Sequence, residues 1–288
     1  MKKEEPYIKT CPNGCESVLY DSHLILPEGI LKCCPVCSQL ISQCSQELYI
    51  NSNQEWDSAE GTWPSKKDLK RLVKRREQTM KTVSKLLSKR YSEIRLLDVG
   101  CSNGAFIWIA KQLGIKAEGV EPAVKAAKAA TELGLKVHLG FLENIKLPEN
   151  AFDVITLFEV IEHISNPMVL LAECYRILCP GGILVIGTGN TNSWTRRILK
   201  SRWDFFDIHQ HGGHINFYNP NSMAVLANNT GFSVQKTKTS AVKLAEKGDF
   251  PYLIYRILKI GSELLNVPTK ILGKGHQMEV FLISNKLK

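Results

Sequence analysis

The chain has 288 residues, of which 44% are hydrophobic and 23% charged, and it carries a net charge of +9 at pH 7. This is the composition of an ordinary globular protein, without internal repeats or low-complexity tracts. No stretch approaches about 18 uninterrupted apolar residues, and the first residues are polar, so neither a membrane span nor a signal peptide is expected. A cytoplasmic location is therefore expected.

Six of the nine cysteines lie within the first 44 residues. In a cytoplasmic chain such a cluster favours metal binding over disulfides. Two short-spaced pairs, 18 residues apart, can direct thiolates at one tetrahedral ion, and the four predicted zinc ligands are Cys11, Cys15, Cys34 and Cys37. Cys33 could replace Cys34, and free thiols are the alternative. We interpret residues 1–50 as a small zinc module whose metal supplies folding energy.

A polar linker is predicted over residues 51–64, and a single α/β domain over residues 65–288. Ser65 can cap a long helix, because apolar residues recur at 3- and 4-residue spacing as far as Leu87. Between Lys66 and Arg90 there are eleven Lys or Arg and two acidic residues. Such a helix could meet nucleic acid or a membrane surface, but without interleaved aromatic residues a solvated face is favoured.

Strands and helices alternate after this helix. Strands are predicted over 94–99, 116–121, 135–139, 152–157, 182–188 and 278–284, and helices over 104–113, from 122 to 134 and over 167–178. The alternation predicts a doubly wound, mostly parallel sheet with right-handed crossovers.

The first strand of this series leads into a glycine-containing loop, Asp98-Val99-Gly100-Cys101-Ser102-Asn103-Gly104. Glycines in such a turn let the backbone approach a ligand and let the next helix begin. The loop lacks the G-x-G-x-x-G pattern of dinucleotide binding. Glu121 ends the next strand, where a carboxylate can accept hydrogen bonds from both hydroxyls of a ribose.

Four segments together resemble the class I S-adenosylmethionine-dependent methyltransferases. They are the loop from Asp98 to Gly104, the acid Glu121, the strand from Phe152 to Ile155 and the turn from Leu178 to Gly182. The resemblance implies a Rossmann-like, seven-stranded fold, with Ser102 where the family usually has glycine. The alternative is a nucleotide-binding oxidoreductase of similar topology.

The resemblance also implies how S-adenosylmethionine is bound. The loop backbone would hold its methionine part, Glu121 its ribose, and Phe158 would face the methyl group. The predicted cofactor-binding residues are Asp98, Gly100, Ser102, Gly104, Glu121, Pro122, Phe141, Leu142 and Phe158. Of these, Pro122, Phe141 and Leu142 would lie near the adenine.

Two segments carry candidate catalytic residues. Glu159, Glu162 and His163 resemble the metal-assisted E-x-x-E-H site of quinone-biosynthesis O-methyltransferases, although a role in shaping the loop is favoured. The second segment, residues 204–218, contains three histidines. His214 is the first choice as a general base and His211 the second, ahead of His209. These rings could instead hydrogen-bond the backbone, and the catalytic candidates are His214, His211 and His163.

The segment from His214 to Tyr218 also resembles methyltransferases of surface-polysaccharide and natural-product synthesis. We therefore predict an enzyme that O-methylates a saccharide or other small metabolite. The alternative is an RNA methyltransferase with a zinc-containing recognition module, and a third possibility is a non-catalytic binding protein. An apolar helix from Phe250 onward could cap the site, form a dimer or rest on a membrane, and a core or lid role is favoured.

Overall fold

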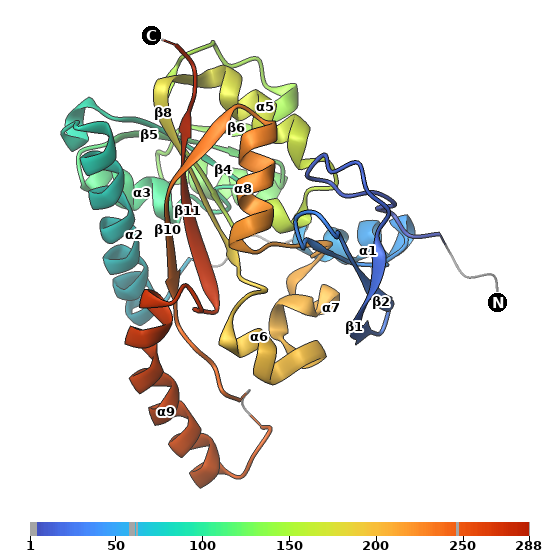
Figure 1. Cartoon of the computed structure of the whole chain (residues 1–288). Coiled ribbons are helices and arrows are strands. Elements are labelled where there is room, and N and C mark those ends of the chain that lie inside the picture. Colours follow the sequence, from blue (N-terminus) through green and yellow to red (C-terminus); the bar gives the residue numbers. More distant parts are fainter. Residues whose placement is uncertain (1–4, 58–60, 62, 246–247, 288) are drawn as a thin grey trace.

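The computed structural model describes residues 5–57, 61, 63–245 and 248–287. Its main sheet has the strand order β10-β11-β8-β7-β4-β5-β6 (Figure 1). The strands are β4 (Arg95–Val99), β5 (Lys116–Glu121), β6 (Val137–Leu139), β7 (Phe152–Phe158), β8 (Leu178–Gly189), β10 (Phe232–Ser240) and β11 (Gln277–Ser284). The strands β4 to β8 pair in parallel, whereas β11 pairs antiparallel with β8 and β10. The predicted seven-stranded, mostly parallel α/β fold is confirmed.

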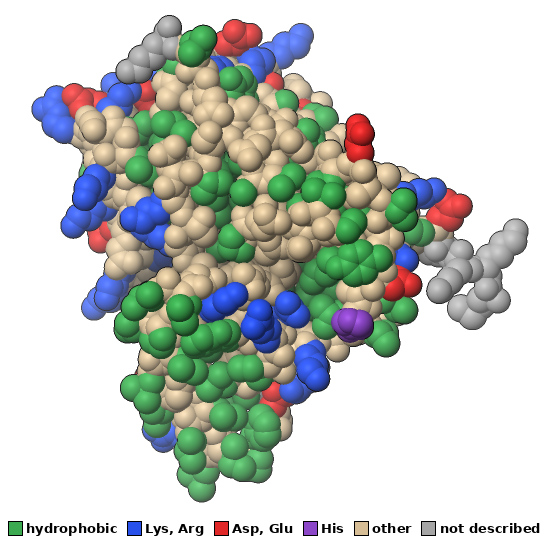
Figure 2. All heavy atoms as spheres, in the orientation of Figure 1, with side chains coloured by type: hydrophobic (Ala, Val, Ile, Leu, Met, Phe, Trp, Pro, Cys, Tyr) green, Lys and Arg blue, Asp and Glu red, His purple; other side chains and the backbone are tan. Residues whose placement is uncertain are grey.

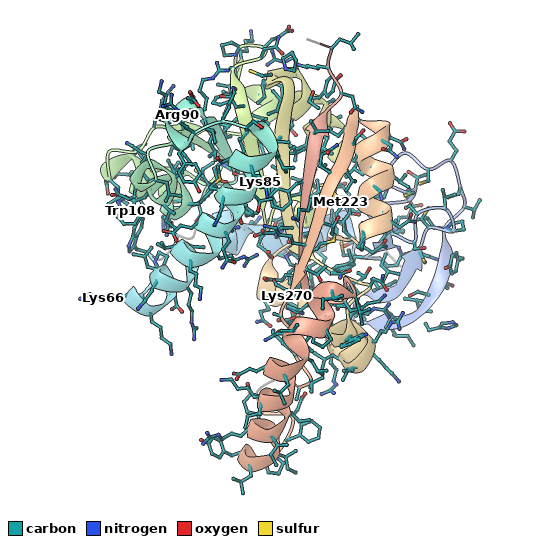
Figure 3. The ribbon with its side chains drawn as sticks, turned by 60° about the vertical axis from the view of Figure 1, so that its left-hand side comes forward. Lys66, Lys85, Arg90, Trp108, Met223 and Lys270 are labelled. Atoms are coloured by element: carbon teal, nitrogen blue, oxygen red, sulfur yellow. The ribbon has the colours of Figure 1, made fainter. Side chains whose placement is uncertain are left out.

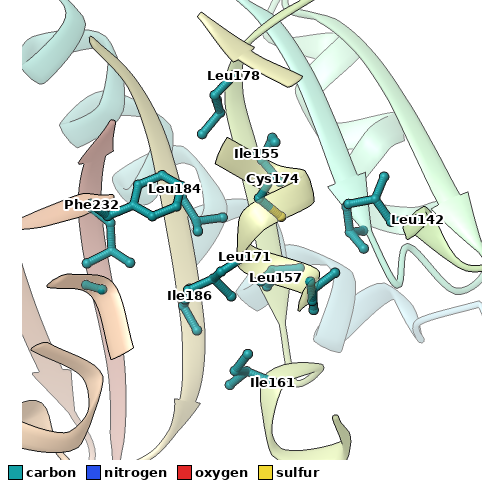
Figure 4. Packing of buried hydrophobic residues seen from close by; sticks show 14 of the residues in the cluster. Leu142, Ile155, Leu157, Ile161, Leu171, Cys174, Leu178, Leu184, Ile186 and Phe232 are labelled. Atoms are coloured by element: carbon teal, nitrogen blue, oxygen red, sulfur yellow. The ribbon is translucent and has the colours of Figure 1, made fainter. Parts of the chain in front are cut away.

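Helices cover both faces of this sheet, because its central strands are apolar on both sides. The helices are α2 (Lys66–Leu87), α3 (Ala105–Gln112), α4 (Val124–Glu132), α5 (Pro167–Ile177) and α8 (Pro220–Asn229). On β7, Ile155 and Leu157 pack with residues of α5 and α8 (Figure 4), whereas Val154 packs with residues of α2 and α3. The alternation of side chains along each strand thus divides the core into two layers.

The basic helix α2 begins where the sequence predicts. The Ser65 hydroxyl caps it by accepting a hydrogen bond from the backbone N–H of Asp68. Its buried residues are Arg76, Thr79, Met80 and Val83, and most of its basic side chains lie at the surface.

The cysteine-rich segment forms a second, smaller sheet that includes a strand from the other end of the chain. Its strands are β1 (Tyr20–Leu26), β2 (Gly29–Cys33), β3 (Leu40–Ile41) and β9 (Asn216–Phe217), in that order. Helix α1 (Gln46–Asp57) follows β3 and crosses the predicted boundary at residue 50. The first half of the predicted linker is therefore helical. At the start of α1 the Ser45 hydroxyl accepts a hydrogen bond from the Leu48 N–H.

Between β8 and α8 the chain forms an insert that contains α6 (Trp194–Leu199), α7 (Ile208–His211) and β9. Helix α9 (Tyr252–Ile271) lies between β10 and β11 and projects away from the sheet (Figure 1). Its apolar side chains are largely exposed, so the core role favoured for this helix is wrong. Among the described residues, no helix combines the length and apolar character that a bilayer span requires.

Candidate functional site

The loop after β4 has the tight backbone that a ligand cradle needs. Gly100, Ser102 and Gly104 all have left-handed φ angles, of 72°, 49° and 79°. A Cβ atom on Gly100 would lie 2.5 Å from Val160, and one on Gly104 would lie 2.4 Å from Leu135, so both positions require glycine. Ser102 adopts the left-handed conformation at a modest energetic cost.

Glu121, at the end of β5, fixes this loop. Its carboxylate accepts hydrogen bonds from the backbone N–H groups of Ser102, at 2.7 Å, and Ala123, at 2.9 Å. The predicted ribose acid and the predicted loop are therefore brought together.

The residues predicted to lie near the adenine differ in how exposed their side chains are. Pro122 directly follows Glu121 and is half-buried, and Phe141 is 59% exposed close to the end of β5. Leu142, in contrast, is buried in the core beside Val120. Because the Leu142 side chain is buried, only its backbone can face a ligand. The sequence did not reveal this burial.

Asp98 is buried beneath the loop, where it accepts a 2.6 Å hydrogen bond from the Thr156 hydroxyl. Burial raises the pKa of its carboxyl group to about 7, against the stabilising effects of Thr156 and Arg76. The hydrogen bond of Asp98 thus joins β4 to β7 directly before the loop.

Asp98→Asn is expected to raise the free energy of unfolding above that of wild type at pH 8. This stabilisation is expected to be about 2 kcal/mol larger at pH 8 than at pH 5.5. The folded pKa lies above the unfolded one, so the wild type loses stability as pH rises from about 4 to 7, and asparagine cannot ionise. Urea unfolding at both pH values measures the difference. Asp21→Asn, at an exposed aspartate, serves as control, and a pH-independent effect of Asp98→Asn would contradict the prediction.

Arg76 is a site residue that the sequence analysis missed. It is buried, with its guanidinium carbon 3.2 Å from the centroid of the Phe158 ring, and its Nε has no hydrogen-bond partner among the described residues. Burial lowers its pKa to about 10, and Glu279 lies 3.5 Å from its NH1 atom. A signal existed, because Arg76 lies on the apolar stripe of α2 between Val73 and Met80.

The turn after β7 packs directly on the loop, since Val160 is the neighbour that excludes a side chain at Gly100. Glu159 has a left-handed φ of 55° and donates its backbone N–H to the Gly187 carbonyl. Its side chain stays open to solvent, but the surrounding protein raises the pKa of its carboxyl group, while Arg75 and Arg76 oppose that rise. Strain of this kind is common at functional sites.

Glu162, His163 and His214 come together beside this turn, with one potential ligand atom of each within 4.8 Å of the others. We call these three residues the carboxylate–imidazole cluster. Glu162 is 1% exposed, and neither of its carboxylate oxygens accepts a hydrogen bond of normal geometry in the described part of the chain, although Thr188 and Glu159 lie close enough to influence its pKa. Burial, and then the charge of Glu159, raise the pKa of Glu162 well above its usual value. A buried carboxylate without a donor is an observation that fits a metal site.

His214 is oriented by the insert. Its Nδ1 lies 2.9 Å from the Phe205 carbonyl oxygen, which can only accept, so Nδ1 carries the proton. Its Nε2 then faces Glu162 Oε1 at 3.8 Å, and its ring centroid lies 4.6 Å from that of His163. Of the other predicted histidines, His209 is exposed, and the side chain of His211 lies outside the described residues.

The four predicted zinc ligands also converge. The sulfur atoms of Cys11, Cys15, Cys34 and Cys37 lie within 4.8 Å of one another. Hydrogen bonds led by the Cys11 thiol lower the pKa of Cys37 to about 5, which favours a thiolate. The neighbouring Cys33 packs instead in a separate apolar cluster with Leu31 and Trp203, so the structure selects Cys34.

The N-terminal segment that contains the cysteine cluster is hydrogen-bonded to the elements that carry the carboxylate–imidazole cluster. Strand β3 pairs with β9, which begins two residues after His214, and the Ser42 N–H donates to the Ile215 carbonyl. On the other side, the Tyr49 hydroxyl of α1 donates to the His163 carbonyl at 2.9 Å. The N-terminal residues therefore contact the backbone beside both histidines.

Comparison with known proteins identifies the family. A family model described as a methyltransferase domain matches residues 70–237. The ubiquinone biosynthesis O-methyltransferase of Maricaulis maris is 34% identical over 39% of this chain and 48% of its own length, and that of Caulobacter sp. is 34% identical over 35% and 42%. The chain thus spans about half the length of the curated relatives it matches.

A solved structure shares the fold. The S-adenosylmethionine-dependent methyltransferase of Archaeoglobus fulgidus aligns with a TM-score of 0.51 and 20% identity, covering 73% of this chain and 94% of its own.

Proposed function

Because the chain belongs to the class I S-adenosylmethionine-dependent methyltransferases, we propose that it methylates a hydroxyl group of a small molecule at the carboxylate–imidazole cluster. The observation that carries the proposal is the buried, unpartnered carboxylate of Glu162 facing His163 and His214. Glu162 and His163 follow the turn that packs against the loop at Gly100, and His214 comes from the insert.

The donor side follows from the loop. The backbone from Gly100 to Gly104 would hold the methionine part of the cofactor and Glu121 its ribose. Arg76, whose Nε has no partner among the described residues, would meet the carboxylate of the methionine part. The methyl group of a sulfonium is already activated, so the protein has to supply alignment and a proton acceptor.

The acceptor side follows from the cluster. With Nδ1 protonated, His214 directs the lone pair of Nε2 at the centre of the cluster, where it can take a proton or bind a cation. One carboxylate and two imidazoles suit a divalent transition metal. When bound, such an ion would lower the pKa of an acceptor hydroxyl.

A pocket of about 560 Å³ lies between the N-terminal module and the insert, but no described residue of its lining belongs to the carboxylate–imidazole cluster or to the loop after β4, so it is not assigned to the acceptor. It is lined by Glu28, Trp203, Asp204 and Lys243, among others, and its size suits a small molecule.

The relatives named above are O-methyltransferases of ubiquinone biosynthesis, which supports oxygen as the acceptor atom. They give no support to the saccharide acceptor predicted from the sequence. We therefore propose a small-molecule hydroxyl, with phenolic and saccharide compounds as the two classes to compare.

The test is transfer of a labelled methyl group from S-adenosylmethionine to a catechol, a saccharide and ribosomal RNA. We expect label in the extractable small molecule, loss of transfer after chelation, and recovery on adding Mg²⁺, Mn²⁺ or Zn²⁺. Zinc content is measured in parallel, so that loss of the thiolate-bound ion is recognised. Label confined to nuclease-sensitive material would contradict the proposal and favour an RNA substrate.

A further inference from the structure

Helix α9 turns its apolar side chains away from the protein. The residues that it buries are small and polar, Ser262 and Thr269. Its exposed apolar residues, with those at its two ends, are Phe250, Tyr252, Leu253, Ile254, Ile257, Ile260, Leu264, Val267, Ile271 and Leu272. Leu264 is 74% exposed and Ile271 79%. This arrangement is the reverse of a helix that packs on a core.

The attachment of α9 to the body is itself polar. The Thr239 hydroxyl of β10 donates to the Thr269 carbonyl, and the Ser262 hydroxyl accepts from the Leu244 N–H. Beyond the labelled Lys270, the rest of α9 projects away from the body (Figure 3). The apolar face therefore remains free along the projecting part of the helix.

A basic border lies next to this apolar face. Residues 194–202 and 249–274 contain eight Lys or Arg and two acidic residues. The Trp194 N–H donates to the Lys274 carbonyl at 3.1 Å, so the start of α6 and the segment after α9 lie side by side. Figure 2 shows blue side chains over α6 beside the green side chains of α9, on one face of the molecule.

The acids in this region do not neutralise the border. Asp249 pairs with Arg202 at 2.7 Å, and the other acid, Glu263, lies on α9 itself. Arg197, Lys200 and Lys270 form no salt bridge within the described ranges. The border therefore carries excess positive charge.

Helix α9 is attached at the edge of the sheet that also carries the candidate site. Gln277, the first residue of β11, pairs with Gly189, the last residue of β8, so α9 joins the sheet at the carboxyl end of the parallel strands. The donor loop and the carboxylate–imidazole cluster follow β4 and β7 at this edge.

We propose that α9 docks the protein on a membrane surface that contains anionic phospholipid. The apolar face enters the boundary between headgroups and acyl chains, while the basic side chains of α6 and α9 contact lipid phosphates. The apolar face of α9 could be covered by a lipid surface or by a second copy of the chain, and charge favours the lipid surface. Anionic lipid complements the basic border, whereas a second copy would bring the same positive charge. The proposal does not depend on the identity of the acceptor.

The test is flotation of the full chain with phosphatidylcholine vesicles that contain or lack phosphatidylglycerol. We expect binding that is at least about tenfold tighter with phosphatidylglycerol and that weakens as salt rises, since each basic side chain near the surface contributes roughly fivefold. The double variant Ile257→Glu/Leu264→Glu is expected to lose binding at least about tenfold. Leu133→Glu, at an exposed leucine at the end of α4, is the matched control and is expected to bind as wild type.

Calorimetric binding of S-adenosylhomocysteine confirms that each variant is folded, independently of any activity. Sedimentation equilibrium then separates the two occupants. The proposal is overturned if the wild type does not float with anionic vesicles, or if the double variant floats as well as the control. A wild-type dimer that the double variant dissociates, together with absent vesicle binding, would assign the face to a second copy.

Discussion

Glu162→Gln is expected to lower kcat by about 10²–10⁴-fold while the affinity for S-adenosylhomocysteine stays unchanged. The carboxylate is buried, faces His163 and His214, and has no hydrogen-bond partner in the described part of the chain. A neutral amide cannot serve there as an anionic ligand or as a charge that supports His214. Initial rates with labelled S-adenosylmethionine measure the change, with Glu149→Gln at an exposed position as the matched control.

The same variant is expected to be at least as stable as wild type when no divalent ion is added. Burial raises the pKa of Glu162, which means that its ionised form is costly in the folded protein. Thermal unfolding therefore distinguishes a functional residue from a structural one. A Glu162→Gln protein that unfolds more readily and keeps its kcat would contradict the assignment.

Cys37→Ser is expected to reduce bound zinc from one ion per chain to almost none, and to unfold the N-terminal module. A structural zinc ion contributes on the order of 10–16 kcal/mol in small zinc domains, and the apolar residues of this module are buried together with residues of the insert rather than in a core of their own. Mass spectrometry of the metal, together with amide exchange over β1, β2 and β3, measures both effects. Cys33→Ser is the matched control, because Cys33 lies next to the cluster but packs elsewhere.

Loss of zinc is expected to reach the active site as well. Strand β3 pairs with β9 next to His214, and Tyr49 donates to the His163 carbonyl, so unfolding of the module removes a backbone contact beside each histidine. We expect kcat/KM to fall at least about tenfold in Cys37→Ser, while S-adenosylhomocysteine still binds at the separate loop. Full activity in a zinc-free protein would show that the module does not position the site.

Local sequence determined the fold class and the donor half of the site. Glycines at 100 and 104, the acid at 121 and the alternation of apolar runs act over short distances, so their spacing alone predicts the loop and the sheet. The two cysteine pairs are predicted for the same reason, since each lies in its own short segment. The strand and helix order follows from the crossover rules of parallel sheets.

The tertiary structure alone decided the rest. His163 and His214 were predicted as separate candidates, and only the folding of the insert over the turn after β7 brings them, 51 positions apart, to one carboxylate. Arg76 was not predicted, although its position fits the apolar stripe of α2, and its contact with Phe158 depends on how two elements pack. The apolar pattern of α9 was visible in the sequence. The pattern predicts that one face of the helix is apolar, but it does not predict what packs on that face. The packing depends on contacts between residues that are distant in the chain.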